Sequence, residues 1–160
     1  MFDTRNDLPV NVRVEVTELL NARLADAIDL GAQSKYAHWN VKGPNFIALH
    51  ELFDKVAESV EDQIDTLAER ITALGGRAHG TIATVARAST LKPYPEDIID
   101  GLAHVDALSA ALADYARKVR AAIEGAGRLG DADTADLFTG ISRETDKYLW
   151  FLEAHLHATR

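Results

Sequence analysis

Apolar residues recur at intervals of three and four along most of the chain, which is the spacing of an amphipathic helix. The first such stretch runs from Val10 to His38 and stops before Gly43-Pro44. A second begins near Asn45 and continues to the Gly75-Gly76 pair, about eight turns later. Alanine, leucine and charged residues dominate, while glycine and proline gather at a few junctions. The pattern therefore predicts an all-α protein.

The periodicity weakens between Arg77 and Asp100, where Pro93 and Pro95 forbid a continuous helix. We expect this segment to cross the bundle, with room for a short helix of its own. The apolar spacing resumes from Gly101 to Glu124 and predicts a third long helix.

Three glycines, Gly125, Gly127 and Gly130, are expected to break the chain before a fourth long helix, with Asp131 or Asp133 as its N-cap. One long crossover between the second and third of four long helices is the ferritin-like connection. The sequence thus predicts one ferritin-like four-helix bundle over residues 1–160, preceded by a short tail at residues 1–9.

Composition narrows the chemistry. The chain has no cysteine, which excludes disulfides, zinc-thiolate sites and cysteine nucleophiles. No stretch reaches the roughly 18 to 20 apolar residues of a membrane span, so a soluble, cytoplasmic protein is expected. The net charge of −8 disfavours phosphate backbones and favours cations, although mild acidity is also common for solubility alone.

The second helix carries a stripe of potential metal ligands. At about 100° per residue, His50, Asp54, Asp65 and Glu69 fall within roughly a 100° arc, together with Glu61. His38 ends the preceding helix, and a short turn could return it beside them. Any one of these residues is better explained by a solvated acidic face. The combination favours iron, manganese or zinc, and open positions favour redox iron.

Spacing along the helix adds a constraint. The His50/Asp54 and Asp65/Glu69 pairs lie about fifteen residues, or roughly 22 Å, apart, so they cannot share a metal within one chain. If two copies of this helix packed antiparallel about a two-fold axis near Ser59 and Val60, each pair would face its complement on the other chain. The spacing therefore predicts two sites per dimer, each built from both chains.

Several motifs resemble the Dps family, the starvation-induced DNA-binding mini-ferritins. They are AHWNVKGPNFIALHELFD at 37–54, IDTLAERITALGG at 64–76, LKPYP at 91–95 and RETDKYLWFLEAH at 143–155. The resemblance implies ferroxidase ligands at His38, His50 and Asp54 of one subunit and at Asp65 and Glu69 of its two-fold mate. It also implies a hollow homododecamer that oxidises Fe(II) at two-iron sites, preferably with hydrogen peroxide, stores ferric mineral and limits oxidative damage.

The resemblance extends to further residues and to rival functions. It implies that Trp39 donates an electron near the site, although aromatic packing at a helix end explains Trp39 equally well. It implies acid-lined pores that include Asp131, Asp133 and Asp136, for which N-capping is the alternative. Zinc or another divalent metal could substitute for iron. A passive metal-sequestering shell and a nucleoid protein that compacts DNA are the rival functions.

Direct DNA binding is doubtful, because the family often uses a lysine-rich tail and residues 1–13 contain no lysine.

The remaining histidine and tryptophan positions give weaker indications of function. We expect surface or capping roles for His79 and His104, and core or interface packing for Trp150 and Phe151.

Overall fold

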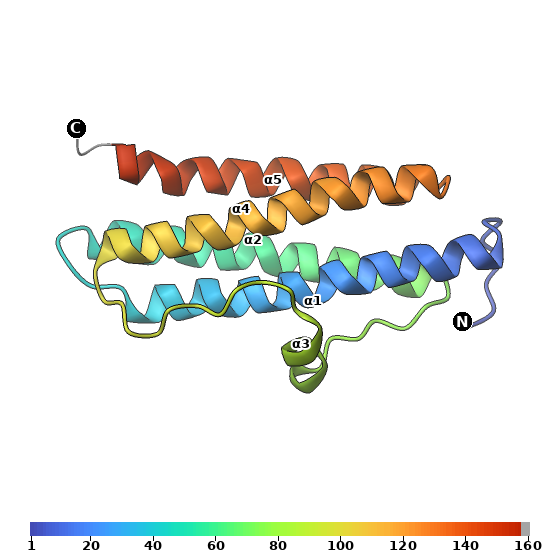
Figure 1. The fold of residues 1–160 in the computed structure, drawn as a ribbon, viewed down its shortest axis with the longest axis horizontal. Helices are drawn as coiled ribbons and strands as arrows, with labels where there is room; N and C mark the ends of the chain where they lie inside the picture. Colours follow the sequence, from blue (N-terminus) through green and yellow to red (C-terminus); the bar gives the residue numbers. More distant parts are fainter. Residues whose placement is uncertain (158–160) are drawn as a thin grey trace.

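The computed structural model describes residues 1–157, so the last three residues of the expected domain lie outside the description. Its regular elements, all of them helices, are α1 (Val10–Asn40), α2 (Phe46–Ala73), α3 (Ile82–Ala88), α4 (Gly101–Arg128) and α5 (Ala132–Leu156). The four long helices form an elongated bundle with α3 on its outside (Figure 1). The all-α, ferritin-like prediction is confirmed. No helix among residues 1–157 is long and apolar enough to cross a membrane.

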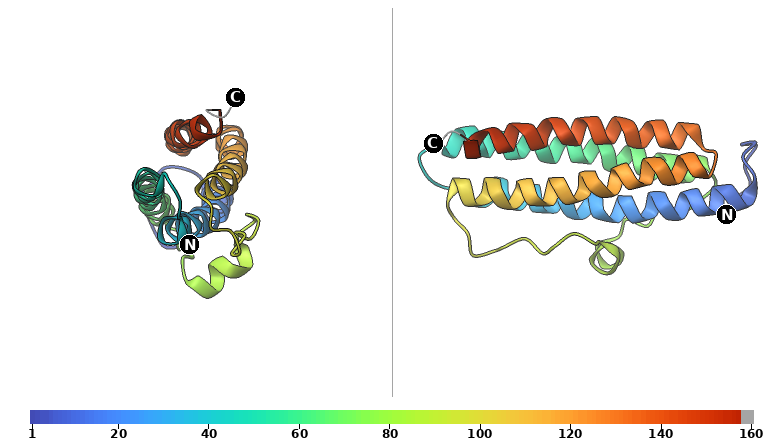
Figure 2. Two further views of the ribbon diagram at one scale, coloured as in Figure 1. Left: turned by 90° about the vertical axis from the view of Figure 1, so that its left-hand side faces the viewer. Right: turned by 45° about the horizontal axis from the view of Figure 1, so that its top comes forward.

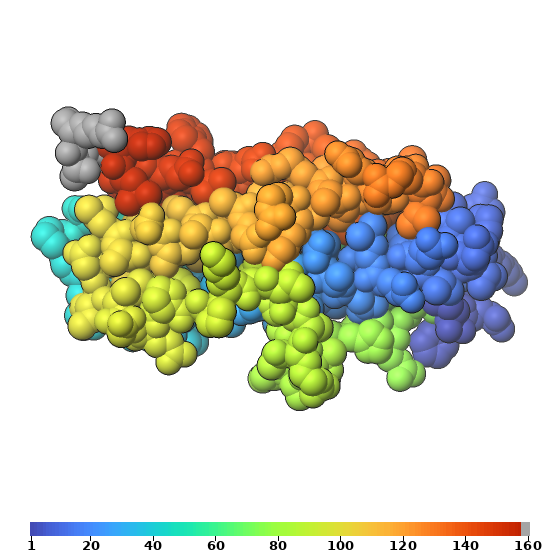
Figure 3. All heavy atoms as spheres, viewed as in Figure 1, coloured from blue at the N-terminus to red at the C-terminus, as the bar shows by residue number. Residues whose placement is uncertain are grey.

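Two helical hairpins make up the bundle. α1 packs along α2, and α4 packs along α5, while α1 and α4 join the hairpins. The segment between α2 and α4 returns along the length of the bundle, so that these two helices run in the same direction (Figures 1 and 2). The space-filling view shows this crossover lying against the long helices, with α3 protruding (Figure 3).

Fully buried apolar side chains from all four long helices form one continuous core. Phe53, Tyr115 and Phe138 are its largest members, surrounded by leucines at the predicted three- and four-residue spacing. Burial of a leucine- or phenylalanine-sized side chain contributes about 1.5–3 kcal/mol, so this stripe, rather than helix propensity, holds the helices in place.

The crossover is fastened by buried polar contacts. The Asp26 carboxylate on α1 is 0 % exposed and accepts hydrogen bonds from the backbone N–H and the hydroxyl of Thr90, at 2.7 and 3.0 Å. The Arg23 guanidinium lies 2.8 Å from its second oxygen. A buried carboxylate needs such partners, and these ones fix where the crossover lies on α1.

Two of the expected helix breaks are wrong. α4 continues through Gly125 and Gly127 to Arg128, and only Gly130, with φ +82°, reverses the chain. A glycine inside a helix costs about 1 kcal/mol, which neighbouring packing can outweigh. A Cβ at Gly125 would lie 3.1 Å from Leu19, so this glycine lets α4 approach α1 closely.

Candidate metal centre

His38 and His50 meet where α1 ends and α2 begins. Their rings stack with centroids 3.7 Å apart. Nδ1 of His38 lies 2.7 Å from the main-chain carbonyl of His50, and Nδ1 of His50 lies 2.8 Å from that of His38. A carbonyl oxygen only accepts, so each Nδ1 carries the proton and each Nε2 keeps a free lone pair. The pair thus offers two imidazole nitrogens ready to bind a metal.

Asp54 lies next to this pair, one helical turn after His50. Its Oδ1 is 4.0 Å from Nδ1 of His38 and accepts a hydrogen bond from the Lys35 ammonium. The Lys35 hydrogen bond, and then the nearby charges, hold the pKa of Asp54 below its usual value despite some desolvation. The carboxylate is therefore ionised at neutral pH, as a metal ligand must be.

Lys35 was not singled out from the sequence. Its position three residues before His38 could have identified it as a neighbour of the ligands, because residues three apart share one side of a helix. Both partners of the ion pair are partly exposed, at 41 % for the Lys35 side chain and 35 % for Asp54. An incoming cation can therefore displace the ammonium without leaving a charge buried.

Asp65 and Glu69 lie one turn apart near the other end of α2, and both are exposed. Because α2 is unbroken, they remain roughly 22 Å from His50 and Asp54. Among residues 1–157, no group of three or more His, Asp or Glu side chains is arranged to hold a metal ion. The subunit therefore presents two separate sets of candidate ligands, at opposite ends of one helix face.

A shallow apolar groove lies between α1 and α2 and has a volume of about 480 Å³. Its lining includes several small residues, the large apolar side chains of Trp39 and Ile64, and the carboxylates of Glu58 and Glu61. Trp39 is 66 % exposed, and Ile47, on the same side of α2 as Asp54, is 61 % exposed. Large apolar side chains left in water beside candidate ligands are typical of a surface that another chain covers.

The three acids proposed for the pore divide into two groups. Asp131 is 2 % exposed and is the N-cap of α5, accepting hydrogen bonds from the Thr134 backbone and hydroxyl. Both its oxygens also bind Arg70, at 2.8 and 3.0 Å. This carboxylate is thus committed inside the subunit, and the pore prediction narrows to Asp133 and Asp136, which are exposed.

His104 departs from the expectation of a surface or capping role. It is 0 % exposed in the core, where its Nδ1 lies 2.9 Å from the Tyr94 hydroxyl. No pattern in the sequence indicated the burial of His104, because its partner Tyr94 lies on the crossover. His79 is exposed. Trp150 is 65 % exposed, which excludes the core and leaves an interface for it.

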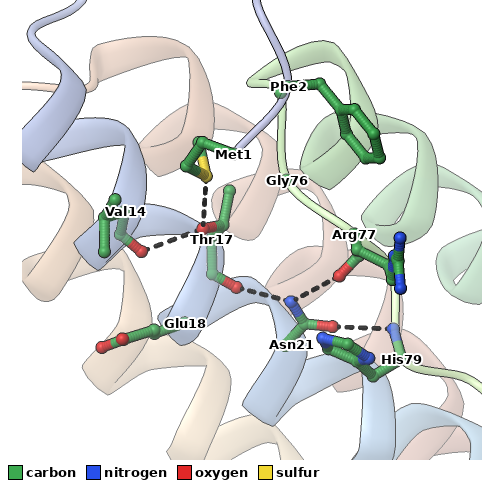
Figure 4. Close-up of a pocket in the computed structure, with 10 residues that line it drawn as sticks. Met1, Phe2, Val14, Thr17, Glu18, Asn21, Gly76, Arg77 and His79 are labelled. Carbon is green, nitrogen blue, oxygen red and sulfur yellow. Dashed lines mark hydrogen bonds between the residues drawn. The ribbon is translucent and has the colours of Figure 1, made fainter.

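The N-terminal segment, without regular structure before α1, is held against the bundle. The Phe2 N–H donates to the Gly75 carbonyl at 2.6 Å, and the Arg13 guanidinium of α1 donates both to the Leu8 carbonyl at 3.1 Å and to the Leu74 carbonyl at 3.0 Å. Figure 4 shows Met1 and Phe2 beside Thr17 and Arg77, around a pocket of about 730 Å³. These contacts bind the predicted tail to the end of α2.

Comparison with known proteins agrees with the fold. Residues 17–160 match the ferritin-like domain family. The DNA protection during starvation protein of Agrobacterium fabrum is 47 % identical over 153 residues, covering 96 % of this chain and 94 % of that one. The protein of the same name from Mycolicibacterium smegmatis is 35 % identical, over 90 % and 78 % of the two chains.

Solved structures give the same result. A Mycobacterium smegmatis Dps structure superposes with a TM-score of 0.93 at 33 % identity, covering 99 % of this chain and 96 % of that one. Dps from Vibrio cholerae O1, described as one of the ferritin-like diiron-carboxylate proteins, gives 0.90 at 29 % identity and 98 % coverage of both. Dps from Microbacterium arborescens in a high iron form gives 0.86 at 33 % identity, with 96 % and 97 % coverage. The chain therefore belongs to the ferritin-like family and, within it, to the Dps proteins.

Proposed function

We propose that this protein is a ferroxidase and iron store whose catalytic site is completed by two subunits. The observation that carries the proposal is the placement of the two ligand sets on α2. One end offers the free Nε2 atoms of His38 and His50 with Asp54, and the other offers Asp65 and Glu69. Two antiparallel copies of α2 would bring each set to its complement.

The α1–α2 groove is the surface that we assign to this pairing. It runs between the two ligand sets, and covering Trp39 and Ile47 would remove their large apolar side chains from water. Pairs of this kind would assemble further into a hollow dodecamer, as the family resemblance implies. Light scattering should give a particle of twelve subunits, whereas a monomer or a twenty-four-subunit particle at micromolar concentration would contradict the assembly.

Fe(II) is the substrate at this site. Imidazole nitrogens with several carboxylates suit iron that must change oxidation state, and zinc or another divalent metal could occupy the same ligands. Two ferrous ions together supply the two electrons that hydrogen peroxide accepts, giving two ferric ions and two water molecules with the uptake of two protons. Because peroxide is reduced by two electrons at once, no hydroxyl radical is released, which explains how the reaction protects against oxidative damage.

Uptake and storage follow from the acidic surface. The net charge of −8 per subunit attracts cations, and exposed Asp133 and Asp136 at the start of α5 are the acids that we assign to an entry pore. Trp39 lines the same groove as Lys35, and we assign to it the donation of an electron near the metal ligands. We assign the protein to the cytoplasm.

Stopped-flow mixing of anaerobically loaded Fe(II) with hydrogen peroxide or oxygen tests the proposal. Fast formation of ferric product with peroxide, slower formation with oxygen and consumption of about one peroxide per two irons are expected. A passive shell would instead bind iron and leave peroxide unconsumed. Arg117→Ala, at an exposed position on α4, a helix that carries none of the candidate ligands, is the control substitution and should leave the rate unchanged.

DNA binding is the second candidate function, and it is favoured by the name of two relatives, DNA protection during starvation protein. The chain argues against strong direct binding. Its net charge is negative, residues 1–13 contain no lysine, and the N-terminal segment is hydrogen-bonded to the end of α2. We expect negligible binding to duplex DNA at physiological salt in chelator. A gel shift at nanomolar protein under those conditions would establish the nucleoid function instead.

A further inference from the structure

Tyr94, on the crossover, and His104, on α4, form a phenol–imidazole pair at the edge of the core. The Tyr94 hydroxyl lies 2.9 Å from Nδ1 of His104, and the two rings stack with centroids 5.9 Å apart. His104 is 0 % exposed. The contact therefore joins an oxidisable, half-buried side chain to a base in the protein core.

The direction of this hydrogen bond follows from the surroundings of His104. Burial lowers the pKa of the imidazole, so the ring is neutral and carries one proton. Nε2 of His104 is buried and has no hydrogen-bond partner among the described residues. We assign the ring proton to Nε2, because this tautomer leaves Nδ1 to accept the Tyr94 hydroxyl proton. Burial also raises the pKa of Tyr94, so the phenol stays protonated.

Both members of the pair contact aromatic residues that adjoin the candidate metal ligands. The Tyr36 ring lies 5.4 Å from that of Tyr94 and belongs to the same helix as His38, two residues earlier. The Phe53 ring lies 6.4 Å from that of His104 and is the residue before Asp54. Packed aromatic side chains therefore extend from the pair to the helical turns that carry His38 and Asp54.

None of the other three tyrosines has a basic partner on its hydroxyl. Tyr36 donates to the main-chain carbonyl of Glu96, which cannot take up a proton. The Tyr115 hydroxyl is buried without a hydrogen-bond partner. Tyr148 lies under the Lys147 ammonium, which is already protonated. A phenol loses its proton when it is oxidised, so Tyr94 is the tyrosine best placed to lose an electron.

We propose that Tyr94 and His104 are a redox-active pair that holds a one-electron oxidising equivalent when iron reaches the site singly. The inference rests on the proposed ferroxidase function. One Fe(II) reacting with peroxide gives Fe(III), hydroxide and an oxidant at the level of hydroxyl radical. Tyr94 gives that oxidant one electron, reducing it to hydroxide, and passes its phenolic proton to Nδ1 of His104.

The products are a neutral tyrosyl radical and an imidazolium. Burial and the Lys42 charge oppose the imidazolium, and the Ile98 backbone and the Asp100 charge stabilise it. A second Fe(II) then returns the electron, His104 returns the proton, and two irons have been oxidised by one peroxide. The pair would thereby preserve the two-iron stoichiometry when the irons arrive one after the other.

Freeze-quench electron paramagnetic resonance tests the pair. The protein is loaded with one Fe(II) per site, mixed with peroxide and frozen after milliseconds. We expect a tyrosyl radical that is lost in Tyr94→Phe, retained in Tyr36→Phe and Tyr115→Phe, and reduced several-fold in His104→Gln. A further addition of Fe(II) should remove it. If Tyr94→Phe forms ferric product at the normal rate and still gives an undiminished tyrosyl radical, the proposed role of the pair is wrong.

A second measurement avoids any folding defect of the variants. Ring-fluorinated tyrosine placed only at position 94 should add fluorine hyperfine splitting to the radical, and a spectrum without the splitting would overturn the assignment. Photochemical oxidation of the metal-free protein by a ruthenium tris-bipyridine oxidant separates this inference from the ferroxidase. A radical at Tyr94 in this arm supports the redox pair even if iron turnover fails, and its absence refutes the pair.

Discussion

His38 and His50 fix each other, because Nδ1 of each ring bonds the main-chain carbonyl of the other, at 2.7 and 2.8 Å. The two contacts close the junction between α1 and α2 and set the tautomer of both rings. Both Nε2 lone pairs are thereby available without any rearrangement. The remaining ligands, Asp54 on the same chain and two carboxylates at the far end of α2, determine what the site can do.

Lys35→Met should strengthen metal binding. The Lys35 ammonium neutralises Asp54 in the metal-free subunit, and a cation must displace it. Since exposed ion pairs contribute about 0–1 kcal/mol, the gain should be up to about fivefold in the dissociation constant for Zn(II). Isothermal titration calorimetry measures it. Lys55→Met is the matched control, because Lys55 is exposed one residue from Asp54. Weaker binding in Lys35→Met would show that Lys35 helps to hold the metal.

Two glycines of α4 should respond oppositely to alanine. A Cβ at Gly101 would lie 2.6 Å from the Leu49 side chain, so Gly101→Ala should destabilise the subunit by about 1–3 kcal/mol. A Cβ at Gly127 meets nothing within 4 Å, and Gly127→Ala should stabilise α4 by up to about 1 kcal/mol. Thermal unfolding followed by circular dichroism measures both, and equal shifts would contradict the packing at Gly101.

Asp131→Asn should destabilise the fold at neutral pH by about 3 kcal/mol, because it leaves the Arg70 charge without its partner. Asparagine remains a good N-cap, so the substitution isolates the charge. Asp133→Asn, at an exposed position in the first turn of α5, should cost only about 0.5 kcal/mol.

Acid should narrow the difference between wild type and Asp131→Asn. Burial raises the pKa of Asp131, but hydrogen bonds from Thr134 and Arg70 outweigh it and hold the folded pKa below its ordinary value of 3.8. The stabilisation is therefore complete above the unfolded pKa and is lost as the pH falls through the folded pKa. The free energies of unfolding of wild type and Asp131→Asn, measured from pH 7 to pH 3, test this loss. A difference between them that stays constant over this range would contradict the ion pair.

The helices could be predicted from the sequence because their apolar stripes repeat every three or four residues over many turns. The break at Gly125 was predicted wrongly because propensity is local, whereas the contact with Leu19 that favours glycine comes from a distant helix. His104 had no sequence signal, since its partner Tyr94 reaches it only after the crossover folds back. Long-range packing therefore marks the limit of the sequence-based prediction.

The candidate site also has features that could be predicted from the sequence and features that could not. Its stripe on α2 follows from helical periodicity, and the separation of its two ends follows from the rise per residue. The turn at Gly43-Pro44 that returns His38 to the stripe was expected, but the reciprocal bonds of His38 and His50 depend on the detailed path of residues 41–45, which the sequence does not specify. The Asp131 cap was one of two predicted alternatives, and the buried ion pair with Arg70 was not foreseen.

The central claim is that each site takes ligands from two chains, and complementation between two inactive variants tests it. His50→Ala with Asp54→Ala removes one ligand set, and Asp65→Ala with Glu69→Ala removes the other. Each variant alone should lose fast iron oxidation. Asp65 and Glu69 are exposed, so the second variant should fold normally.

In a mixed dimer both defects fall on one site, and the other site keeps unaltered ligands from each chain. Random mixing makes about half of the dimers mixed, so roughly a quarter of all sites should recover. The decisive measurement is peroxide-driven iron oxidation by a verified co-assembled particle. The two-chain account predicts about a quarter of wild-type activity, and activity no higher than in the separate variants would contradict it.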